Sequence, residues 1–222
     1  MMEEAAVQDT VNFKAELVRK AIHLLSLAIP IIYYFIPKEL ALWIIFPVTA
    51  IFIIADLARY EIPQFSGFFY KFFGFLLRKH EIDEKKHALN GATFMLISAA
   101  ICIAIFPKYI MLCSFPVLIL GDAASAVFGK RFGRHKIFPN KPKSYEGSLA
   151  FIVAGMVAVA LTPKVNYIIA EYLIGITATI VASIAEALSY EIIDDNIAIP
   201  ISFGLTMWGL YVIFLPNLVS HF

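Results

Sequence analysis

Hydrophobic residues in this chain are gathered into long runs, and polar residues fall mainly between the runs. A helix that crosses a lipid bilayer needs about 20 mostly apolar residues. Seven runs meet this requirement, and prolines or charged clusters such as Pro37-Lys38-Glu39 separate them. They cover residues 17–36, 40–58, 88–106, 109–129, 147–163, 168–189 and 197–216. The pattern predicts an all-α, polytopic integral membrane protein with about seven transmembrane helices.

The lysines and arginines are distributed unevenly between the predicted loops. Three lie in the N-terminal segment with the start of the first run, six in the loop after the second run and six in the loop after the fourth. The other side of the membrane receives only Lys38, Lys108 and Lys164. Because cytoplasmic loops are enriched in Lys and Arg, we expect a cytoplasmic N-terminus and an outside C-terminus.

Residues 64–79 form a Phe-rich segment that also carries Lys71, Arg78 and Lys79. The segment is short for a membrane span and lies in a predicted cytoplasmic loop. We interpret it as one interfacial amphipathic helix with its aromatic face in the lipid. The alternative is a packed re-entrant segment.

Composition supports a membrane protein and excludes some partners. The chain has 222 residues, of which 60% are hydrophobic, whereas a soluble domain has about 45–50%. The net charge of +1 argues against nucleic acid, which requires a strongly basic face. Cys102 and Cys113 lie in apolar runs and are expected to act as small hydrophobic residues. The polar, acidic N-terminus does not resemble a signal peptide, so we expect the first run to be retained and residues 1–222 to form one domain.

Asp122 is the most unusual residue, because it is an acid about two turns inside the fourth predicted span. An acid embedded in a membrane is costly and marks a functional site by default. Its neighbours, Gly121 and Ala123 to Ala126, are small and permit close approach of a helix or a ligand. The alternative is close helix packing in which Asp122 bonds a basic neighbour.

The loop after Asp122 combines glycines with six cations, which are Lys130, Arg131, Arg134, Lys136, Lys141 and Lys143. Gly129 and Gly133 permit turns with positive φ that direct backbone N–H groups at an anion. This is not a Walker loop, because Arg131 occupies the position of the required Ser or Thr. A cationic loop can also be a topology signal or bind anionic lipid. However, the run Lys143-Ser144-Tyr145-Glu146-Gly147-Ser148 opens the next span, and the amides at a helix N-terminus attract phosphate.

Two further groups of polar residues lie at the same predicted face. Glu16, Arg19, Lys20 and His23 share one face of the first helix, although cations at a helix end also reach the interface without a function. Asp56 and Arg59 end the second span, where they form either a functional pair or a simple interfacial ion pair.

The loop after the sixth span has no cation and carries Glu191, Asp194, Asp195 and Asn196, with Glu186 one turn inside the preceding helix. Carboxylate and amide oxygens suit Mg²⁺, which is a hard cation. A solvated acidic turn is the alternative.

The chain resembles the CTP-dependent polyprenol kinase family. This family includes dolichol kinase, phytol and farnesol kinases and the yeast-type CTP-using diacylglycerol kinase. The resemblance covers nearly the whole chain. It rests on Glu16–Arg19-Lys20–His23, on Asn90-Gly91-Ala92-Thr93, on the block Gly121-Asp122…Gly129…Gly133…Lys143-Ser144…Glu146-Gly147-Ser148, and on Asp195-Asn196…Pro200. The central block is also similar to phosphatidate cytidylyltransferases, but the Gly-rich C-terminal motif of those enzymes is missing here.

The resemblance implies an enzyme of lipid metabolism that transfers the γ-phosphoryl group of CTP, with Mg²⁺, to an isoprenoid alcohol of the dolichol, polyprenol or phytol type. Asp122, Asp195 and Asn196 are the candidate metal ligands. Candidate nucleotide-binding residues are Arg19, Lys20, Gly129, Lys130, Arg131, Gly133, Lys143, Ser144, Glu146, Gly147 and Ser148, with the nucleotide loop at about 121–148. His23 and Asp56 are the candidates for the base, and Asp122 and Lys143 complete the catalytic set.

Three alternatives stay open at this point. They are a CTP-dependent diacylglycerol kinase, a phosphatidate cytidylyltransferase that makes a CDP-lipid, and a non-enzymatic transporter. The clustering of acids at one face and the lack of a visible repeat argue against the transporter. We expect the site on the cytoplasmic side of a prokaryotic plasma membrane. The sequence does not specify the oligomeric state.

Overall fold

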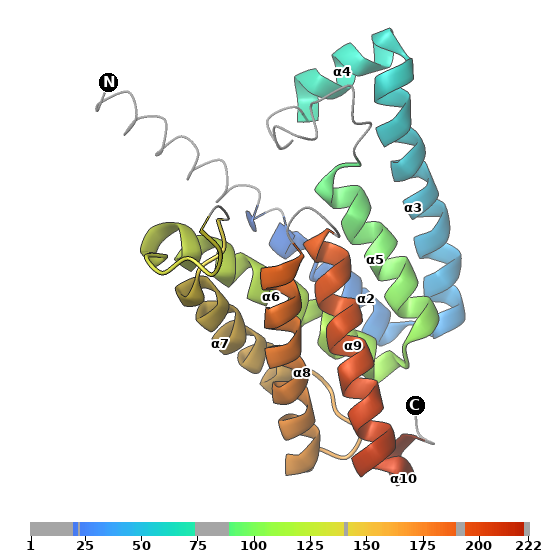
Figure 1. Ribbon diagram of the computed structural model, residues 1–222. Coiled ribbons are helices and arrows are strands. Elements are labelled where there is room, and N and C mark those ends of the chain that lie inside the picture. Colours follow the sequence, from blue (N-terminus) through green and yellow to red (C-terminus); the bar gives the residue numbers. More distant parts are fainter. Residues whose placement is uncertain (1–19, 22, 74–88, 140–141, 190–193, 220–222) are drawn as a thin grey trace.

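The computed structural model describes residues 20–21, 23–73, 89–139, 142–189 and 194–219 (Figure 1). This part of the chain is helical apart from its connecting loops and an isolated bridge that pairs Lys136 with Ser144, which confirms the all-α prediction. The helices are α2 (Ala28–Phe35), α3 (Lys38–Glu61), α4 (Pro63–Phe73), α5 (Gly91–Ile105), α6 (Lys108–Phe132), α7 (Tyr145–Leu161), α8 (Ile169–Leu188), α9 (Asp195–Phe214) and α10 (Pro216–Val219).

Within the described residues, each of the seven predicted apolar runs contains a helix. Four of these helices, α3, α6, α8 and α9, are long and apolar enough to cross a membrane. The helical segments His23–Phe35, Gly91–Ile105 and Tyr145–Leu161 are apolar but shorter. The count of seven spans and their orientation therefore stay predictions.

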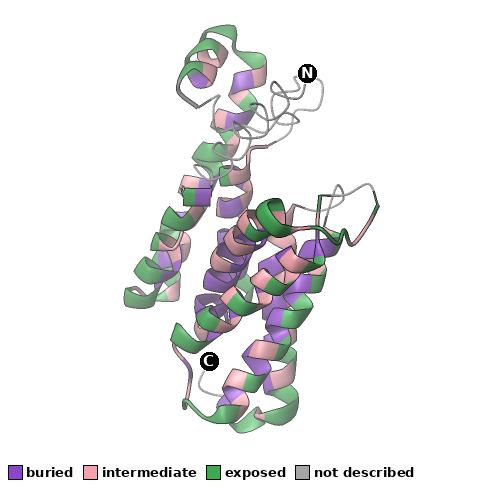
Figure 2. Cartoon of the chain, turned by 90° about the vertical axis from the view of Figure 1, so that its left-hand side faces the viewer, coloured by how far each residue is buried: buried purple, intermediate pink, exposed green. Residues whose placement is uncertain are grey.

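The longest helix, α6, lies at the centre of the bundle and packs against α2, α7 and α9 (Figure 1). Its residues from Ile110 to Ile119 are all buried, as expected for a helix that is hydrophobic on every side. By contrast, α3 buries a single stripe that includes Ala41, Ile45 and Thr49, and most of α3 and α4 is exposed (Figure 2).

Glycines set how closely the helices pack. A side chain at Gly121 on α6 would come within 2.8 Å of the Phe151 ring on α7. Similarly, a Cβ atom at Gly155 on α7 would meet Thr179 on α8 at 2.5 Å. Small residues at such contacts let helix backbones approach, which is the main source of packing energy inside a membrane.

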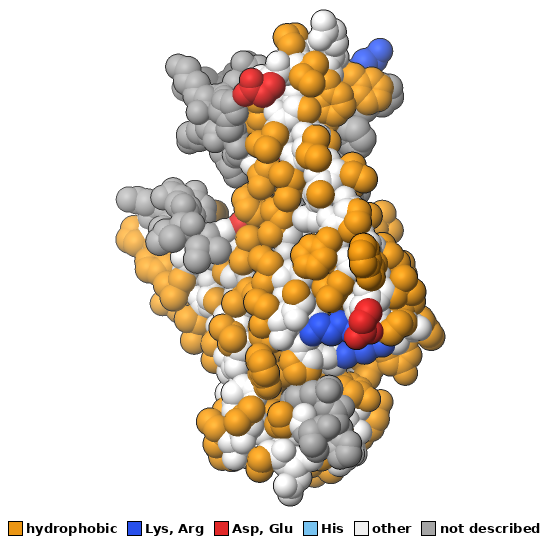
Figure 3. Space-filling model, turned by 90° about the vertical axis from the view of Figure 1, so that its right-hand side faces the viewer, with side chains coloured by type: hydrophobic (Ala, Val, Ile, Leu, Met, Phe, Trp, Pro, Cys, Tyr) orange, Lys and Arg blue, Asp and Glu red, His pale blue; other side chains and the backbone are white. Residues whose placement is uncertain are grey.

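The surface toward lipid is hydrophobic. The face shown in Figure 3 is dominated by apolar side chains, and single residues such as Trp43 and Leu161 are 80% and 77% exposed. An apolar belt of this extent is unusual on a soluble protein and agrees with a bilayer as the solvent.

Helices α5, α7 and α9 begin at the same end of the bundle, which is the end where α3, α6 and α8 finish (Figure 1). We call it the inner end, after the predicted orientation. Polar side chains cap these helices: Asn90 accepts from the Thr93 amide, Ser144 from the Gly147 amide and Asp194 from the Asn196 amide. Such caps satisfy amides that have no partner within the helix.

The three lysines predicted on the outside face bond carbonyls at helix ends. These helix ends lie at the other end of the bundle, which we call the outer end. Lys38 Nζ donates to the Phe106 carbonyl at 3.3 Å, and Lys108 Nζ donates to the Ile36 carbonyl at 2.8 Å. Lys164 Nζ donates to the carbonyls of Val159 and Thr162. These lysines satisfy carbonyls at helix C-termini and are structural.

The predicted interfacial segment 64–79 is partly described. Helix α4 turns away from the end of α3 at Pro63 and runs to Phe73 (Figure 1), and residues 74–79 lie outside the described part. Within α4, Phe68 is exposed whereas Phe69 is buried beneath the Arg59 guanidinium. A helix is confirmed here, and its interfacial position stays a prediction.

Candidate functional site

Asp122 is buried near the inner end of α6 and forms an ion pair with Lys20. The Nε2 atom of His23 lies 3.5 Å from Oδ2 of the same carboxylate. The predicted face of the first helix and the intramembrane acid are therefore brought together from positions 102 residues apart. The alternative interpretation also expected a basic partner and close packing around Asp122, so this contact alone does not assign a function.

A second ion pair lies where the nucleotide loop meets α8 and α9. Lys143 Nζ bonds Glu186 Oε1 and lies 3.8 Å from Asp195 Oδ2. Ser125 on α6, three residues after Asp122, donates to the same Glu186 oxygen at 3.0 Å. Residues from the loop and three helices thus meet at one buried point.

Electrostatics connect the two pairs. Burial by itself would lower the pKa of Lys143, but the charges of Glu186, Asp195 and Asp122 outweigh it and raise the pKa above 10.5. Lys143 is therefore a cation at neutral pH and interacts with all three acids. We call the group Lys20, His23, Asp122, Lys143, Glu186 and Asp195 the charged cluster.

The loop between α6 and α7 is a short folded unit that presents Lys143. The Ile137 amide donates to the Lys143 carbonyl at 3.1 Å, and the Tyr145 amide donates to the His135 carbonyl at 3.0 Å. The Glu146 carboxylate accepts from the amides of Arg134 and His135 and from the His135 ring. Hydrogen bonds from its own backbone amide and then from His135 lower the pKa of Glu146 to about 2. Glu146, a predicted nucleotide residue, thus organises the loop.

The positive φ expected at Gly129 and Gly133 is wrong, because no described glycine has one, and the nucleotide-binding role of these glycines stays a prediction. Their role is close approach. A Cβ atom at Gly133 would come within 2.2 Å of the Gly129 carbonyl oxygen and 2.5 Å of Ser144 Oγ. Gly147 is similarly close to the Ser125 carbonyl oxygen, at 3.1 Å. The glycines dock the start of α7 onto the end of α6.

The N-terminus of α7 is already satisfied. The Gly147 amide donates to Ser144 Oγ at 3.2 Å, and the Ser148 amide donates to the Ser144 carbonyl at 3.0 Å. The buried hydroxyl of Ser148 has no hydrogen-bond partner among the described residues. At the start of α7, the Ser148 hydroxyl is therefore a polar group whose hydrogen bond is not yet made.

Several other predicted nucleotide residues lie away from these contacts. Lys130 and Arg131 are on the exposed last turn of α6, where the Arg131 guanidinium lies 5.6 Å from the Phe132 ring centroid. Arg19, together with Glu16, Lys141 and Glu191, lies outside the described residues.

Asp195 and Asn196 begin α9, with Asp194 as the cap. The Asn196 side-chain amide donates to Asp194 Oδ1 at 2.7 Å. Asn196 Oδ1 is buried and accepts no hydrogen bond within the described chain. Glu186 Oε2 is also buried and accepts no hydrogen bond within the described chain.

The donor atoms fit a magnesium ion that is carried with a nucleotide. No three His, Cys, Asp or Glu side chains in the described ranges are grouped closely enough to hold a metal by themselves. Mg²⁺ at nucleotide sites is usually held by one or two carboxylates, substrate phosphates and water. The unpartnered oxygens of Glu186 and Asn196 are hard ligands of the required kind, and Asp195, which precedes Asn196, faces the same lysine as Glu186.

Asp56 belongs to a different group of residues, on α3 and at the start of α5. Its carboxylate accepts from the Asn90 amide at 2.8 Å and from the Asn90 side chain at 2.7 Å, and Arg59 Nη1 lies 3.4 Å away. Asp56 and Arg59 are completely buried, so their pair is not an exposed interfacial one. Asp56 ties the start of α5 to α3.

Sequence reasoning noticed Glu186 but gave it no role. The signal was present, because Glu186 is an acid inside an apolar helix, as Asp122 is. Its partners Lys143 and Ser125 are 43 and 61 residues away in sequence. The sequence placed Lys143 at the same membrane face as Glu186 but gave no indication that the two side chains pair.

Curated relatives cover most of the chain. An uncharacterized protein of Rickettsia prowazekii is 29% identical over 198 residues, which are 89% of this chain and 95% of the relative. The CTP-dependent diacylglycerol kinase 1 of Saccharomyces cerevisiae is 25% identical over 216 residues, which are 87% of this chain and 73% of the relative. A probable chloroplastic phytol kinase of Triticum aestivum is 27% identical over 142 residues, or 58% of this chain and 46% of the relative.

Further relatives with 24–32% identity carry the same two kinase names. No family model matches the chain. No solved structure matches it either.

Proposed function

The chain is a relative of the CTP-dependent lipid kinases, as its motifs indicated, and we propose that it transfers the γ-phosphoryl group of CTP to the hydroxyl of a lipid alcohol. The acceptor in this proposal is an isoprenoid alcohol of the polyprenol, dolichol or phytol type. The reaction takes place at the inner end of the bundle, on the cytoplasmic side of a prokaryotic plasma membrane.

The charged cluster is the observation that carries the proposal. Phosphoryl transfer requires positioning and charge neutralisation more than covalent help. The cluster offers two lysines for phosphate oxygens, the buried Lys20 and the partly buried Lys143, and carboxylates of which one or two would hold a divalent cation together with phosphate and water. Without substrate these groups neutralise one another. A nucleotide with its metal would replace these internal ion pairs, because its phosphates would bind the lysines and its Mg²⁺ would bind carboxylates.

Mg²⁺ would neutralise phosphate charge when bound, and Asp122 and Asp195 with Asn196 would hold it together with phosphate oxygens and water, while Glu186 would position Lys143. Lys143 and Lys20 bind phosphate oxygens. The Ser148 hydroxyl donates a hydrogen bond, and Ser144, Gly147 and Glu146 hold the loop in position. Lys130, Arg131 and Arg19 provide the positive field that attracts the nucleotide.

His23 is the better of the two candidate bases. Its imidazole lies beside Asp122, which orients the ring and stabilises the cation formed when a proton is accepted. The acidic oxygens of Asp56 instead hold Asn90 and Arg59. In the reaction, the alcohol oxygen forms a bond to the γ-phosphorus, the bond to the bridging oxygen breaks, CDP leaves and His23 takes the hydroxyl proton.

Diacylglycerol is the second candidate acceptor, because the Saccharomyces cerevisiae relative that covers 87% of this chain is named a diacylglycerol kinase. The chemistry at the charged cluster would be the same. Only the lipid bound beside it would differ.

An acceptor panel tests the proposal. Purified protein is incubated with γ-labelled CTP, Mg²⁺ and, in turn, polyprenol, phytol, farnesol, diacylglycerol or phosphatidic acid. We expect label in the monophosphate of an isoprenoid alcohol, with CDP as the other product. Label released as pyrophosphate with consumption of phosphatidic acid would contradict the kinase and indicate a cytidylyltransferase.

A further inference from the structure

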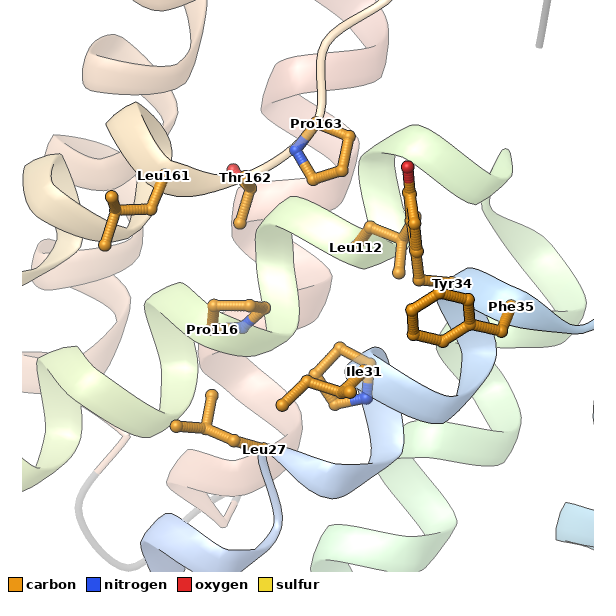
Figure 4. A pocket seen from close by; sticks show the side chains of 10 residues that line it. Leu27, Ile31, Tyr34, Phe35, Leu112, Pro116, Leu161, Thr162 and Pro163 are labelled. Atoms are coloured by element: carbon orange, nitrogen blue, oxygen red, sulfur yellow. The ribbon is translucent and has the colours of Figure 1, made fainter.

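An apolar hollow of about 310 Å³ opens between α2, α6 and the end of α7 (Figure 4). Its volume is at the lower end of the range for ligand pockets, which is about 300–1,000 Å³. Leu27 and Ile31 on the α2 side face Leu112 and Pro116 on α6, and Leu161 closes the α7 side (Figure 4). We propose that this hollow binds the hydrocarbon chain of the isoprenoid acceptor, an inference that rests on the proposed function.

Two chain segments connect the lining of the hollow with the charged cluster, although no residue of the cluster lines the hollow itself. Leu27 follows His23 by four residues, and amides of the tightened turn between them bond back to the carbonyls of His23 and Leu24. On α6, Pro116 precedes Asp122 by six residues, which is a rise of about 9 Å along a helix. A hydrocarbon chain whose far end lies in the hollow near Phe35 would extend past Leu27 and Pro116, and its hydroxyl end would continue about 9 Å farther along α6 to reach Asp122.

The polarity of the lining selects the kind of lipid. In a prenol, the hydroxyl is attached at the end of the hydrocarbon chain, so apolar atoms follow it directly. In a diacylglycerol, ester carbonyls lie next to the hydroxyl and need hydrogen-bond donors. The lining residues closest to the cluster are Leu27, Pro30, Ile31 and Pro116, whose side chains donate none. A buried carbonyl without a donor costs about 1–3 kcal/mol.

The polar residues of the lining lie at the far end. The Thr162 hydroxyl already donates to Val159 and Cys113, and Tyr34 is near the outer end of α2. The hollow therefore offers a wholly apolar path next to the site, which fits one isoprenoid chain better than glycerol esters.

Photolabelling tests the hollow without relying on turnover. The full-length protein in lipid vesicles is exposed to a farnesol analogue that carries a diazirine at the end of its chain. Mass spectrometry then locates the label. We expect it on the segments 27–35 and 112–116, and excess unlabelled farnesol should remove it. Label spread equally over α3, or displaced as well by diacylglycerol as by farnesol, would overturn the proposal.

Two matched substitutions add a functional readout. Ile31→Trp places a bulky side chain in the hollow, whereas Ile54→Trp places the same side chain on the exposed surface of α3; Ile31 and Ile54 are 57% and 65% exposed. We expect Ile31→Trp to raise the KM for farnesol about tenfold, the size of effect seen when an apolar pocket loses room, with the KM for CTP unchanged. Equal KM values for the two variants would contradict the proposal.

The two proposals fail in different ways. Competed labelling of the hollow without phosphoryl transfer to any alcohol would support the binding site and overturn the proposed reaction. Phosphoryl transfer to farnesol with labelling distributed over all lipid-facing helices would support the reaction and overturn the binding site.

Discussion

Each lysine of the charged cluster is paired with a buried carboxylate, and this pairing has a definite energetic consequence. Removing one partner of a buried pair leaves an uncompensated charge, which costs about 3–5 kcal/mol. A loss of activity after a single substitution in the cluster can therefore reflect unfolding. Variants of Lys20, Asp122, Lys143 and Glu186 need a stability control for this reason.

Asp122→Asn should abolish phosphoryl transfer, because the substitution removes the carboxylate that faces both Lys20 and His23. We expect kcat to fall by about 100-fold or more, the effect of removing a group that stabilises developing charge. The double variant Lys20→Met/Asp122→Asn is the control, since it leaves no buried lysine unpaired. It should melt near the wild-type temperature in detergent and stay inactive. Turnover by Asp122→Asn at the wild-type rate would remove this residue from the mechanism.

Lys143→Ala should raise the apparent KM for CTP. The folded-state pKa of Lys143 is raised, so its charge is present below pH 10.5 and is lost only as the pH rises through the higher folded value. The wild-type KM should consequently show no titration of this lysine between neutral pH and pH 10.5. Lys136→Ala is the control, because Lys136 lies in the same loop and bonds the Pro142 carbonyl. An unchanged KM in Lys143→Ala would disprove the phosphate role.

The two ends of α8 provide a matched pair of buried glutamates. Glu186 meets Lys143 and Ser125, whereas Glu171 accepts from three loop amides and from the Tyr211 hydroxyl at 2.8 Å. We expect Glu186→Gln to lower activity by about 10- to 100-fold, as loss of a supporting residue does. Glu171→Gln should instead lower the free energy of unfolding by about 1–3 kcal/mol and keep the KM for CTP. Identical behaviour of the two variants in activity and melting assays would contradict a specific role for Glu186.

At the scale of elements, the docking of the loop and of α7 onto α6 determines where Lys143 lies. Gly133→Ala would force a methyl group against the Gly129 carbonyl and Ser144, which displaces the loop. We expect a higher KM for CTP in kinetic assays. Gly209→Ala on α9 is the control, because nothing lies within 4 Å of its Cβ position. Alanine there should leave the KM unchanged and favour the helix slightly. A normal KM in Gly133→Ala would show that the loop position is unimportant.

The elements also show what a sequence can and cannot specify. The helices were predicted well from the apolar runs, because the length of a run and the prolines that interrupt it act locally along the chain. The positive φ predicted for the glycines was wrong, because the need for a small residue at Gly133 comes from its packing against the Gly129 carbonyl and against Ser144 across the loop. The pairing of Lys143 with Glu186 is likewise tertiary. Lys20, His23 and Asp122 were predicted at one face, and only the packing of the first helical segment beside α6 brought them into contact.

At the scale of the whole molecule, the alternating helices place the charged cluster and its cationic loop at one end and the three structural lysines at the other. The predicted orientation can be tested with reporter cysteines, because Cys102 and Cys113 are buried. Arg134→Cys should react with a membrane-impermeant thiol reagent only from the cytoplasmic side, and Glu39→Cys only from outside. Labelling of both positions from one side would contradict a bundle that crosses the membrane with this topology.

The most direct test of the central claim follows both ends of the triphosphate in a single reaction. The protein is incubated with farnesol and CTP that carries one phosphorus isotope in the α position and another in the γ position, and both labels are counted in the extracted lipid. Transfer of the γ-phosphoryl group predicts γ label and no α label in the lipid, with the α label recovered in CDP. Lipid that carries the α label, or no label in farnesol or in any other alcohol of the acceptor panel, would contradict a CTP-dependent lipid kinase.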